Sequence, residues 1–487
     1  MLSYARLNYH RNATIPLRPT IDNQEWNVTG TESAEYIEAL SFHADGTNGP
    51  DDVCRYGRLV GDEILNWVTQ SRDYAALNRL KASPKFRGGI RLLILERLYY
   101  QPPSFPVNKE TFLAIEKQFN LPENTLLALS NECGMSTHVL DVDEEAGVPR
   151  RLSMIMKAHQ KFQVGNYGLA FSYDFATGLC TGILHGTGVT QHGDDFAMWS
   201  KKAGAELFEH IQVAAHRSWA HPLFLPVTLL QHHLLRADYF CTVVLANKHT
   251  NVQNQLGTMR AGRLFGTHAR HIATELPVQQ AKISLRELTV EMSGLAFDVT
   301  WFCAVADWEC SCLRLLQEVL AEMESLDRKL KDTKMRARIQ YLASLAESIQ
   351  RHNTGMKENS QVDMNVLYSV ISQVDNRLNA KMAAAASRDS AAMKTLAFLT
   401  TLFLPGTFVA TIFSTGLFNW QGDGKVVSDL FWVYWALAVP LTIVVGAGWR
   451  LWWSLEKKHF DRDISVEIKA IDGNGDVAGG KRTPPAA

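Results

Sequence analysis

The pattern of apolar and polar positions divides the chain into a mixed N-terminal part, a helical middle and two apolar runs near the C-terminus. Residues 395–422 contain no charged side chain, and residues 430–449 contain none either. Each run can cross the hydrocarbon core of a bilayer, which takes about 20 helical residues. We therefore predict transmembrane helices at 396–413 and 430–450, joined by an external loop at 414–429. The alternative for each run is a buried core helix of a soluble protein.

Basic and aromatic residues border this pair of runs. Five tryptophans between positions 432 and 453 lie where interfacial anchors are expected. The flanking basic residues are Lys381, Arg388 and Lys394 before the first run and Arg450, Lys457 and Lys458 after the second. The positive-inside rule then places both termini in the cytosol or the matrix and the loop outside. Two runs in succession with such borders favour membrane helices over core helices.

Residues 283–395 have the pattern of a helical stalk. One apolar stripe with steps of three and four residues requires a partner helix. Its members are Leu367, Val370, Val374, Leu378 and Met382. No proline or clear cap interrupts Gln361 to Leu404, which predicts one continuous helix leading into the membrane. The polar segments 325–334 and 351–360 are predicted to be turns between stalk helices.

Residues 1–282 mix short apolar runs with helical patterns, which predicts a soluble α/β domain. The strand candidates are 90–95, 152–156, 168–173 and 179–184, the last two joined by a turn at 174–178. Residues 196–216 have the amphipathic pattern of a helix. At the other end of the chain, residues 451–487 are predicted to form a polar cytosolic tail.

Composition narrows the setting. The formal net charge of −1 gives no electrostatic reason to expect a nucleic acid partner. Seven scattered cysteines lack the spacing of a disulfide framework or a CxxC zinc site, which favours a reducing compartment. Residues 1–21 carry three arginines and no acid, as transit peptides do, but Pro16 and Pro19 oppose an amphipathic helix. The plasma membrane is therefore expected over the mitochondrial inner membrane.

Enzymatic motifs are missing from the sequence. It contains no Walker A loop, GxGxxG, GxSxG or HExxH, so we predict a protein that is not an enzyme and has no covalent cofactor. Histidines gather between 210 and 233, and we interpret them as surface or packing residues because their spacings do not repeat one helical face. The segment LHGTG at 184–188 is interpreted as a turn. The metal ligands of the soluble part remain unassigned.

The first membrane segment carries hydroxyl groups along one face. At 100° per residue, one set of side chains falls within about 40° of a single line. Its members are Met393, Leu396, Thr400, Leu404, Thr407, Thr411 and Ser414. Helix packing by small polar residues is one explanation. A water-filled lumen formed by several copies is the other, with Met393 and Leu396 as an apolar constriction. A permeant cation would meet only neutral oxygens there, which suits a divalent ion that dehydrates reluctantly.

The stretch MKTLAFLTTLFLPGTFVATIF, at 393–413, resembles the first membrane helix of the CorA magnesium-transporter superfamily. FLPGTFVA is its most recognisable part. The layout is also similar, with an N-terminal α/β domain, a helical stalk and two C-terminal membrane helices, so a CorA-like funnel is the expected fold. The similarity is greatest to fungal CorA-like proteins, whose first membrane segment often ends in a comparable Phe-Asn-Trp.

This resemblance implies a homopentamer in which the first membrane helix lines a pore and a Gly-Met-Asn motif holds the hydrated ion at the outer mouth. The implied gate consists of Met393 and Leu396 with Ser390 as a polar ring beside them. The implied pore lining is Thr400, Leu404, Thr407 and Thr411.

The selectivity motif itself departs from the family. An ungapped alignment puts Ser414, Thr415 and Gly416 where Gly-Met-Asn is expected. A slipped alignment lets Gly416 and Asn419 supply the turn and the amide, with one residue more between them.

Two hypotheses follow. The first is a homopentameric, channel-like transporter that passes magnesium or zinc across the lipid bilayer, with Asp423 and Asp429 concentrating cations at the outer mouth. The second is a CorA-like membrane scaffold or sensor that has lost conduction together with the selectivity motif.

Overall fold

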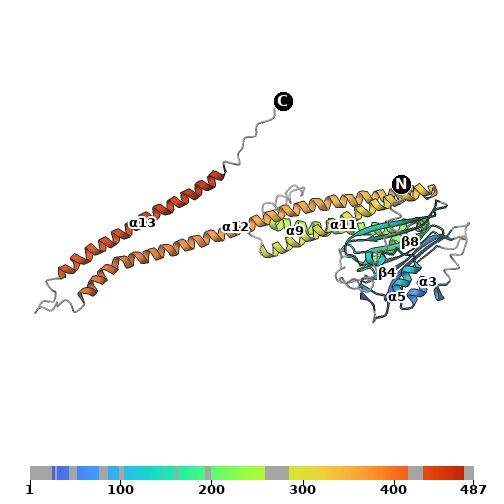
Figure 1. Ribbon diagram of the computed structural model, residues 1–487, viewed down its shortest axis with the longest axis horizontal. Coiled ribbons are helices and arrows are strands. Elements are labelled where there is room, and N and C mark those ends of the chain that lie inside the picture. Colours follow the sequence, from blue (N-terminus) through green and yellow to red (C-terminus); the bar gives the residue numbers. More distant parts are fainter. Residues whose placement is uncertain are drawn as a thin grey trace, which may run out of the picture. The chain divides into compact units, whose positions relative to one another are not determined.

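The structure is a computed structural model, and it divides the chain into two compact units, Met1–Ser369 and Val370–Ala487. Figure 1 colours the elements along the sequence. The described residues are 25–27, 30–42, 52–75, 86–97, 104–145, 147–159, 163–191, 199–257, 285–414 and 431–475, without the side chains of 25, 329 and 456–475.

A seven-stranded mixed sheet forms the centre of the first unit. Its strand order is β3-β2-β4-β9-β8-β7-β6. The strands are β2 (Ser33–Phe42), β3 (Val53–Val60), β4 (Phe86–Glu96), β6 (Met135–Val142), β7 (Pro149–Lys157), β8 (Gly168–Asp174) and β9 (Leu179–Gly186). Neighbouring strands are antiparallel except β4 and β9, which are parallel. Two further strands, β1 (Glu25–Trp26) and β5 (Ser104–Phe105), form a separate parallel pair.

All four strand candidates are confirmed, as parts of β4, β7, β8 and β9. The predicted turn between the last two is also present, and Gly178 adopts φ 68° there, a left-handed conformation that favours glycine. The sequence analysis missed β2, β3 and β6. Their charged and polar side chains interrupt the apolar alternation that identifies a strand.

Helices cover both faces of this sheet (Figure 1). On one face α3 (Glu63–Thr69), α5 (Lys109–Gln118) and α6 (Thr125–Ser130) enclose a core with buried Trp67, Phe112 and Ile183. On the other face lies α7 (Ala203–Val213), whose Gly204 approaches Ile94 of β4. The predicted helix at 196–216 is therefore shorter than expected, since Lys202 is extended and residues 192–198 lie outside the described part.

Long helices follow the sheet. The remaining helical elements are η2 (Arg72–Tyr74), η4 (His216–Ala220), α8 (Phe224–Tyr239), the π-helix η5 (Phe240–Leu245), α9 (Ala246–Leu256), α11 (Leu285–Leu326), η7 (Arg328–Leu330), α12 (Thr333–Phe413) and α13 (Phe431–Gly475). The break around η7 confirms the turn predicted at 325–334. The continuous helix predicted from Gln361 to Leu404 is confirmed as part of α12.

The turn predicted at 351–360 is wrong, because α12 continues through it. The polar residues of this segment do not break the helix, since tertiary contacts use them. Asn353 is buried and its Nδ2 donates to the Val299 carbonyl of α11 at 3.2 Å, while Met356 is buried as well. Packing of α12 against α11 thus overrides the local turn signal.

Within the part of the chain that the structure describes, three helices are long and apolar enough to cross a membrane, namely Leu285–Leu326, Thr333–Phe413 and Phe431–Leu455. The last two contain the runs predicted as membrane helices, whereas the first was predicted as part of the helical stalk, so the prediction of two spans stays a prediction. In the most apolar 18-residue stretch of each helix, 33% is buried in α11, against 11% in α12 and 6% in α13. Residues of α11 are buried by neighbouring helices as well as by the α/β layer, since the Phe302 ring centroid lies 5.6 Å from that of Phe240 and Trp308 Nε1 donates to the Met135 carbonyl of β6 at 3.3 Å.

Candidate functional site

The C-terminal part of α12 and the start of α13 pack as an antiparallel pair within the second unit. Later residues of α12 contact earlier residues of α13, as expected for antiparallel helices. The Phe398 and Trp449 ring centroids lie 5.8 Å apart, and the Tyr434 hydroxyl donates to the Gly406 carbonyl at 3.4 Å. Pro405, Val409 and Ala438 are buried at this contact.

The hydroxyl stripe lies on the opposite face of α12. At 100° per residue, the buried positions 405 and 409 are about 140° and 180° from the middle of the stripe. Thr400, Thr407 and Thr411 are exposed, and so is Leu404. The chain's own second helix therefore does not cover these hydroxyls, and a packing role would need another copy or another protein.

The threonine hydroxyls donate their protons to their own helix. Thr400 Oγ1 donates to the Ala397 carbonyl at 2.9 Å, and Thr407 Oγ1 donates to the Leu404 carbonyl at 2.9 Å. Thr411 Oγ1 donates to the Thr407 carbonyl at 2.8 Å. A hydroxyl has one proton and two lone pairs, so the outward side of each oxygen can only accept a hydrogen bond. The stripe is a row of neutral acceptors.

The predicted gate residues Met393 and Leu396 lie on the same exposed face, about one to two turns before Thr400, whereas Ser390 lies about 80° around the helix from the middle of the stripe. Met393 is 73% exposed and Leu396 is 64% exposed, and Ser390 is exposed as well. Lys394, between them in sequence, turns away from the stripe, since its Nζ lies 4.6 Å from the ring centroid of Trp453 on α13. This cation–π contact keeps the ammonium off the hydroxyl face.

The predicted outer mouth is only partly described. Ser414 is exposed, and its N–H donates to the Ala410 carbonyl at 3.0 Å, so it closes the last turn of α12. Thr415, Gly416, Asn419, Asp423 and Asp429 lie outside the described residues.

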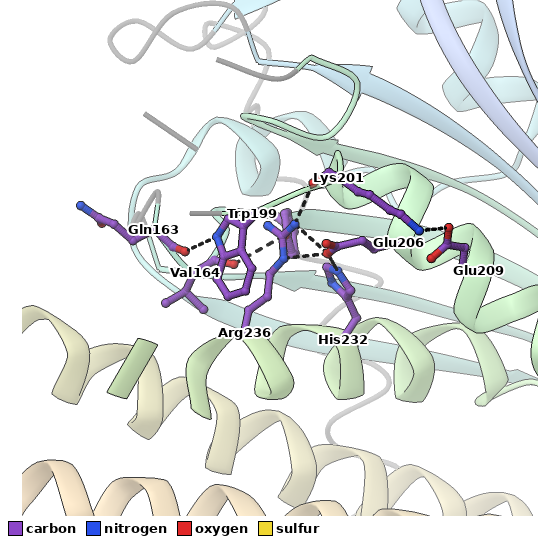
Figure 2. A network of polar contacts seen from close by, with 9 residues as sticks. Gln163, Val164, Trp199, Lys201, Glu206, Glu209, His232 and Arg236 are labelled. Carbon is purple, nitrogen blue, oxygen red and sulfur yellow. Dashed lines mark hydrogen bonds and ion pairs between the residues drawn. The ribbon is translucent and has the colours of Figure 1, made fainter. Parts of the chain in front are cut away.

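A separate polar network lies in the first unit, between α7 and α8 (Figure 2). The Glu206 carboxylate contacts His232 Nε2 at 2.8 Å and accepts from Arg236 Nη2 at 2.7 Å. Arg236 also donates to the Tyr167 hydroxyl at 2.9 Å and lies 4.5 Å from the Trp199 ring centroid. Each polar group has a partner from another segment, so the network joins these segments.

Burial sets the protonation of this network. It lowers the pKa of His232 to about 4, so the imidazole is neutral at neutral pH, despite the opposing hydrogen bond to Glu206. Burial raises the pKa of Glu206, but the His232 hydrogen bond and the Arg236 charge outweigh it and hold the pKa below its usual value. The network is thus an ion pair of Glu206 and Arg236 with a neutral histidine.

The interpretation of the clustered histidines as packing residues agrees with these contacts. His232 and His233 are buried, and His233 Nδ1 lies 2.6 Å from Glu309 Oε1 of α11. The sequence analysis missed Glu206, although it precedes His210 by one helical turn and so shares its face of α7. Within the described residues, no group of three or more His, Cys, Asp and Glu side chains is arranged to hold a metal ion.

Of the segment 184–188, residues 184–186 are the end of β9, and only 187 and 188 form a turn. Glu96 accepts from the backbone N–H groups of Gly188 at 2.5 Å and Thr190 at 2.7 Å. His185 is fully buried, and burial lowers its pKa to about 3. The interpretation of this segment as a turn is therefore wrong for 184–186, which pair with neighbouring strands, and confirmed for 187 and 188.

Comparison with known proteins gives limited matches. No family model matches the chain. The curated "Notoamide biosynthesis cluster protein M'" of Aspergillus versicolor is 32% identical over 112 residues, which is 22% of this chain and 24% of that protein. The chain thus matches about a quarter of the relative's length. The relative's name mentions no ion, so the predicted closeness to fungal CorA-like proteins stays a prediction.

Two solved structures are similar at low sequence identity. The soluble domain of CorA from Methanocaldococcus jannaschii is 13% identical with a TM-score of 0.35, covering 59% of this chain and 93% of that one. The full-length CmaX protein is 13% identical with a TM-score of 0.35, covering 88% of this chain and 99% of that one. At these TM-scores neither similarity carries an argument about function.

Proposed function

We propose that this protein is a CorA-like membrane transporter that passes a hydrated divalent cation, magnesium or zinc, through a homopentameric pore. The observation that carries the proposal is the row of exposed acceptor oxygens on Thr400, Thr407 and Thr411, on the face of α12 that α13 leaves uncovered. The resemblance of residues 393–413 to the CorA pore helix supports the same assignment.

The chemistry of a hydrated cation fits this row. Water molecules around a divalent cation turn their oxygens inward and their O–H groups outward. The ion with its hydration shell therefore presents donors, and the threonine oxygens accept from them without removing any water. Water molecules around an anion turn their O–H groups inward and their oxygens outward. These outward oxygens are acceptors, so they face the threonine oxygens without a proton to share. A neutral lining of this kind favours cations without any charged side chain.

The gate in this proposal is an apolar ring. Met393 and Leu396, repeated around the axis, narrow the lumen and exclude water when it closes. Ser390 supplies a polar ring on the cytosolic side. Because Lys394 lies against Trp453, its positive charge does not oppose cations at this point.

Flux is inward under an interior-negative potential. A divalent ion gains about 4.6 kcal/mol per 100 mV, twice the ~2.3 kcal/mol per elementary charge. Asp423 and Asp429 concentrate cations at the external loop, and Gly416 with Asn419 replaces the missing Gly-Met-Asn. No covalent chemistry is involved, and we place the protein in the plasma membrane with both termini cytosolic.

The second candidate function is a non-conducting scaffold or sensor of the same architecture. The sequence Ser414, Thr415 and Gly416 in place of Gly-Met-Asn favours it. The row of acceptors opposes it, because a helix that lines no lumen does not need aligned, uncovered hydroxyl groups.

Ion flux into liposomes containing the purified protein decides between the two, with magnesium, zinc and potassium compared. We expect divalent flux that Thr407→Leu lowers by about tenfold or more, since five copies each lose an acceptor worth about 1 kcal/mol. Thr401→Leu is the matched control, because Thr401 makes the same type of bond, to the Ala397 carbonyl at 2.7 Å, but lies off the stripe.

Asn419→Ala tests the outer mouth in the same assay. If selectivity among the three ions disappears in this variant, the segment from Gly416 to Asn419 acts as the filter. A folded, pentameric protein that passes no ion rejects the transporter assignment and leaves the scaffold.

A further inference from the structure

A cavity of about 410 Å³ lies in the first unit, between the end of α5 and the strands β7, β8 and β9. Its volume is in the range of small-molecule sites, about 300–1,000 Å³. Residues from five separate segments line it, and none of them belongs to the hairpin of α12 and α13.

The floor of the cavity is an unusual part of the sheet. Under α6 this sheet face is apolar, with Ile155 and Ala170 in a buried cluster. Two residues further along the same strands it becomes polar. Ser153 donates to Ser172 at 3.5 Å, and Thr181 Oγ1 donates to the Phe119 carbonyl at 3.1 Å. The inner face of the sheet thus continues into the cavity as a floor of hydroxyl groups.

Two opposite charges face each other across this floor without pairing. Arg151 of β7 and Asp174 of β8 are directly opposed in the strand register, and both line the cavity. Among the described residues, no ion pair or hydrogen bond occupies the Arg151 guanidinium. Asp174 Oδ1 accepts from the N–H groups of Ala176 at 2.8 Å and Thr177 at 3.4 Å. The turn therefore uses one carboxylate oxygen and leaves the other for a ligand.

We propose that this cavity binds a small zwitterion of the free amino acid class. The ligand carboxylate contacts the Arg151 guanidinium, and the ligand ammonium contacts Asp174 Oδ2. Phe86 and Leu179 supply an apolar wall for the carbon chain, and Asn120 supplies an amide at the rim. A ligand with a single charge would leave the other protein charge without a partner, whereas a zwitterion satisfies both.

Isothermal titration calorimetry on the full-length, detergent-solubilised protein tests this assignment. The probes are L-serine, L-glutamine and L-leucine as zwitterions, with acetate and ethylammonium as the two halves. We expect at least one of the amino acids to bind with a Kd in the millimolar range or tighter and each half to bind more weakly.

Two variants localise the binding. Arg151→Gln and Asp174→Asn are each expected to weaken it about tenfold or more, because each removes one charge-assisted hydrogen bond. Asparagine keeps the oxygen that holds the turn, so Asp174→Asn preserves the fold. The matched control is Arg150→Gln, an exposed neighbour that does not line the cavity. Its affinity should equal that of the wild type.

Three results would overturn the proposal. One is the absence of saturable heat with all three amino acids. Another is acetate binding as tightly as the amino acids, which would indicate a simple anion site. The third is an equal loss in Arg150→Gln and Arg151→Gln, which would indicate a general charge effect. None of these outcomes bears on ion flux through α12.

Discussion

The two units of the molecule differ in which side chains they bury and which they expose. In the first unit, buried charges find partners on other segments, as Glu38 does with Arg91 Nε at 3.0 Å. In the second unit, the described threonine hydroxyls bond to their own helix, and large apolar side chains such as Ile443 and Val444 are exposed. Hydroxyl groups in helices of the first unit bond to their own helix as well, as Thr289 does to the Leu285 carbonyl at 2.7 Å. The exposed apolar side chains are therefore the feature that distinguishes the second unit and favours lipid around it. Lipid offers no hydrogen-bond partner, so a helix placed in it must satisfy its polar groups by itself.

The largest expected effect is a difference in solubility between the first unit alone and the full-length protein. A chain ending at Ser369 is expected to stay soluble without detergent, because it lacks both uncovered apolar helices while the apolar face of α11 packs on the α/β layer. The full-length protein is expected to need detergent. Ultracentrifugation of both after detergent removal measures this.

A truncated chain that sediments with the full-length protein would show that α11 also requires lipid. The third apolar helix would then be a membrane span, and the assignment of two membrane helices would be wrong.

The next effect tests the paired interior of the first unit. Arg91→Met removes the partner of Glu38, and both side chains are almost fully buried. We expect the free energy of unfolding to fall by about 3–5 kcal/mol, because an uncompensated carboxylate is left inside. The variant also removes the stacking of Arg91 on Trp67, whose ring centroid lies 4.1 Å away.

Denaturant unfolding of the chain ending at Ser369 measures this loss. Arg58→Met is the control, since Arg58 is exposed on β3 and its replacement should change the stability by no more than about 0.5 kcal/mol. Equal losses in the two variants would contradict a specific role for the buried pair.

A smaller effect depends on pH. Lys157 is fully buried, and its Nζ donates to the carbonyls of Ala158 at 3.0 Å and Asn166 at 2.8 Å. Burial, followed by the positive charge of Arg97, lowers its pKa to about 7. The unfolded lysine titrates near 10.4, so between these values the unfolded state binds one more proton than the folded state. Stability therefore rises with pH from 7, by up to about 1.4 kcal/mol per pH unit.

Unfolding measured from pH 7 to pH 9 on the wild type and on Lys157→Met tests this sign. The range ends at pH 9 because buried thiols act in the opposite sense above it, as burial raises the pKa of Cys241 to about 12. We expect the slope to be lost in the variant. If the free energy of unfolding of the wild type and of Lys157→Met changed with pH in the same way, Lys157 would be protonated in the folded state.

The smallest effect tests the second unit. Thr411→Val is expected to change the stability of the hairpin by less than about 0.5 kcal/mol, because the hydroxyl bonds only to its own helix and α13 does not cover it. The reverse change at a buried position, Val409→Thr, should cost about 1 kcal/mol or more. Titration with sodium dodecyl sulfate, followed by circular dichroism, compares them. A larger loss in Thr411→Val would place Thr411 at a helix contact.

The sequence predicted the parts of the fold in which local pattern and environment agree. β4, β7, β8 and β9 contain short apolar runs because they are largely buried. β2 was missed because Glu35 and Glu38 interrupt its apolar pattern, and their partners Lys202 and Arg91 are distant in sequence. The continuation of α12 through 351–360 depends on Asn353 contacting α11, which no local pattern reveals.

The candidate sites divide in the same way. The hydroxyl stripe follows from helical geometry alone, so residue spacing predicts it. The side covered by α13 follows from contacts such as Phe398 with Trp449, which spacing does not predict. The cavity was missed altogether, because Arg151, Asp174 and the end of α5 come together only in the folded sheet.

The parallel pairing of β4 with β9 has a consequence for synthesis. Ile90, Leu92 and Ile94 of β4 pair with residues 180–184, so about 90 residues must be translated before this edge is covered. At about 5–20 residues per second, that takes roughly 5–18 s. An apolar strand edge that stays open this long is prone to aggregation. The open edge of β4 is therefore the kind of extended apolar segment to which chaperones bind, and it is exposed until residue 186 has emerged from the ribosome, well before α12 has been made.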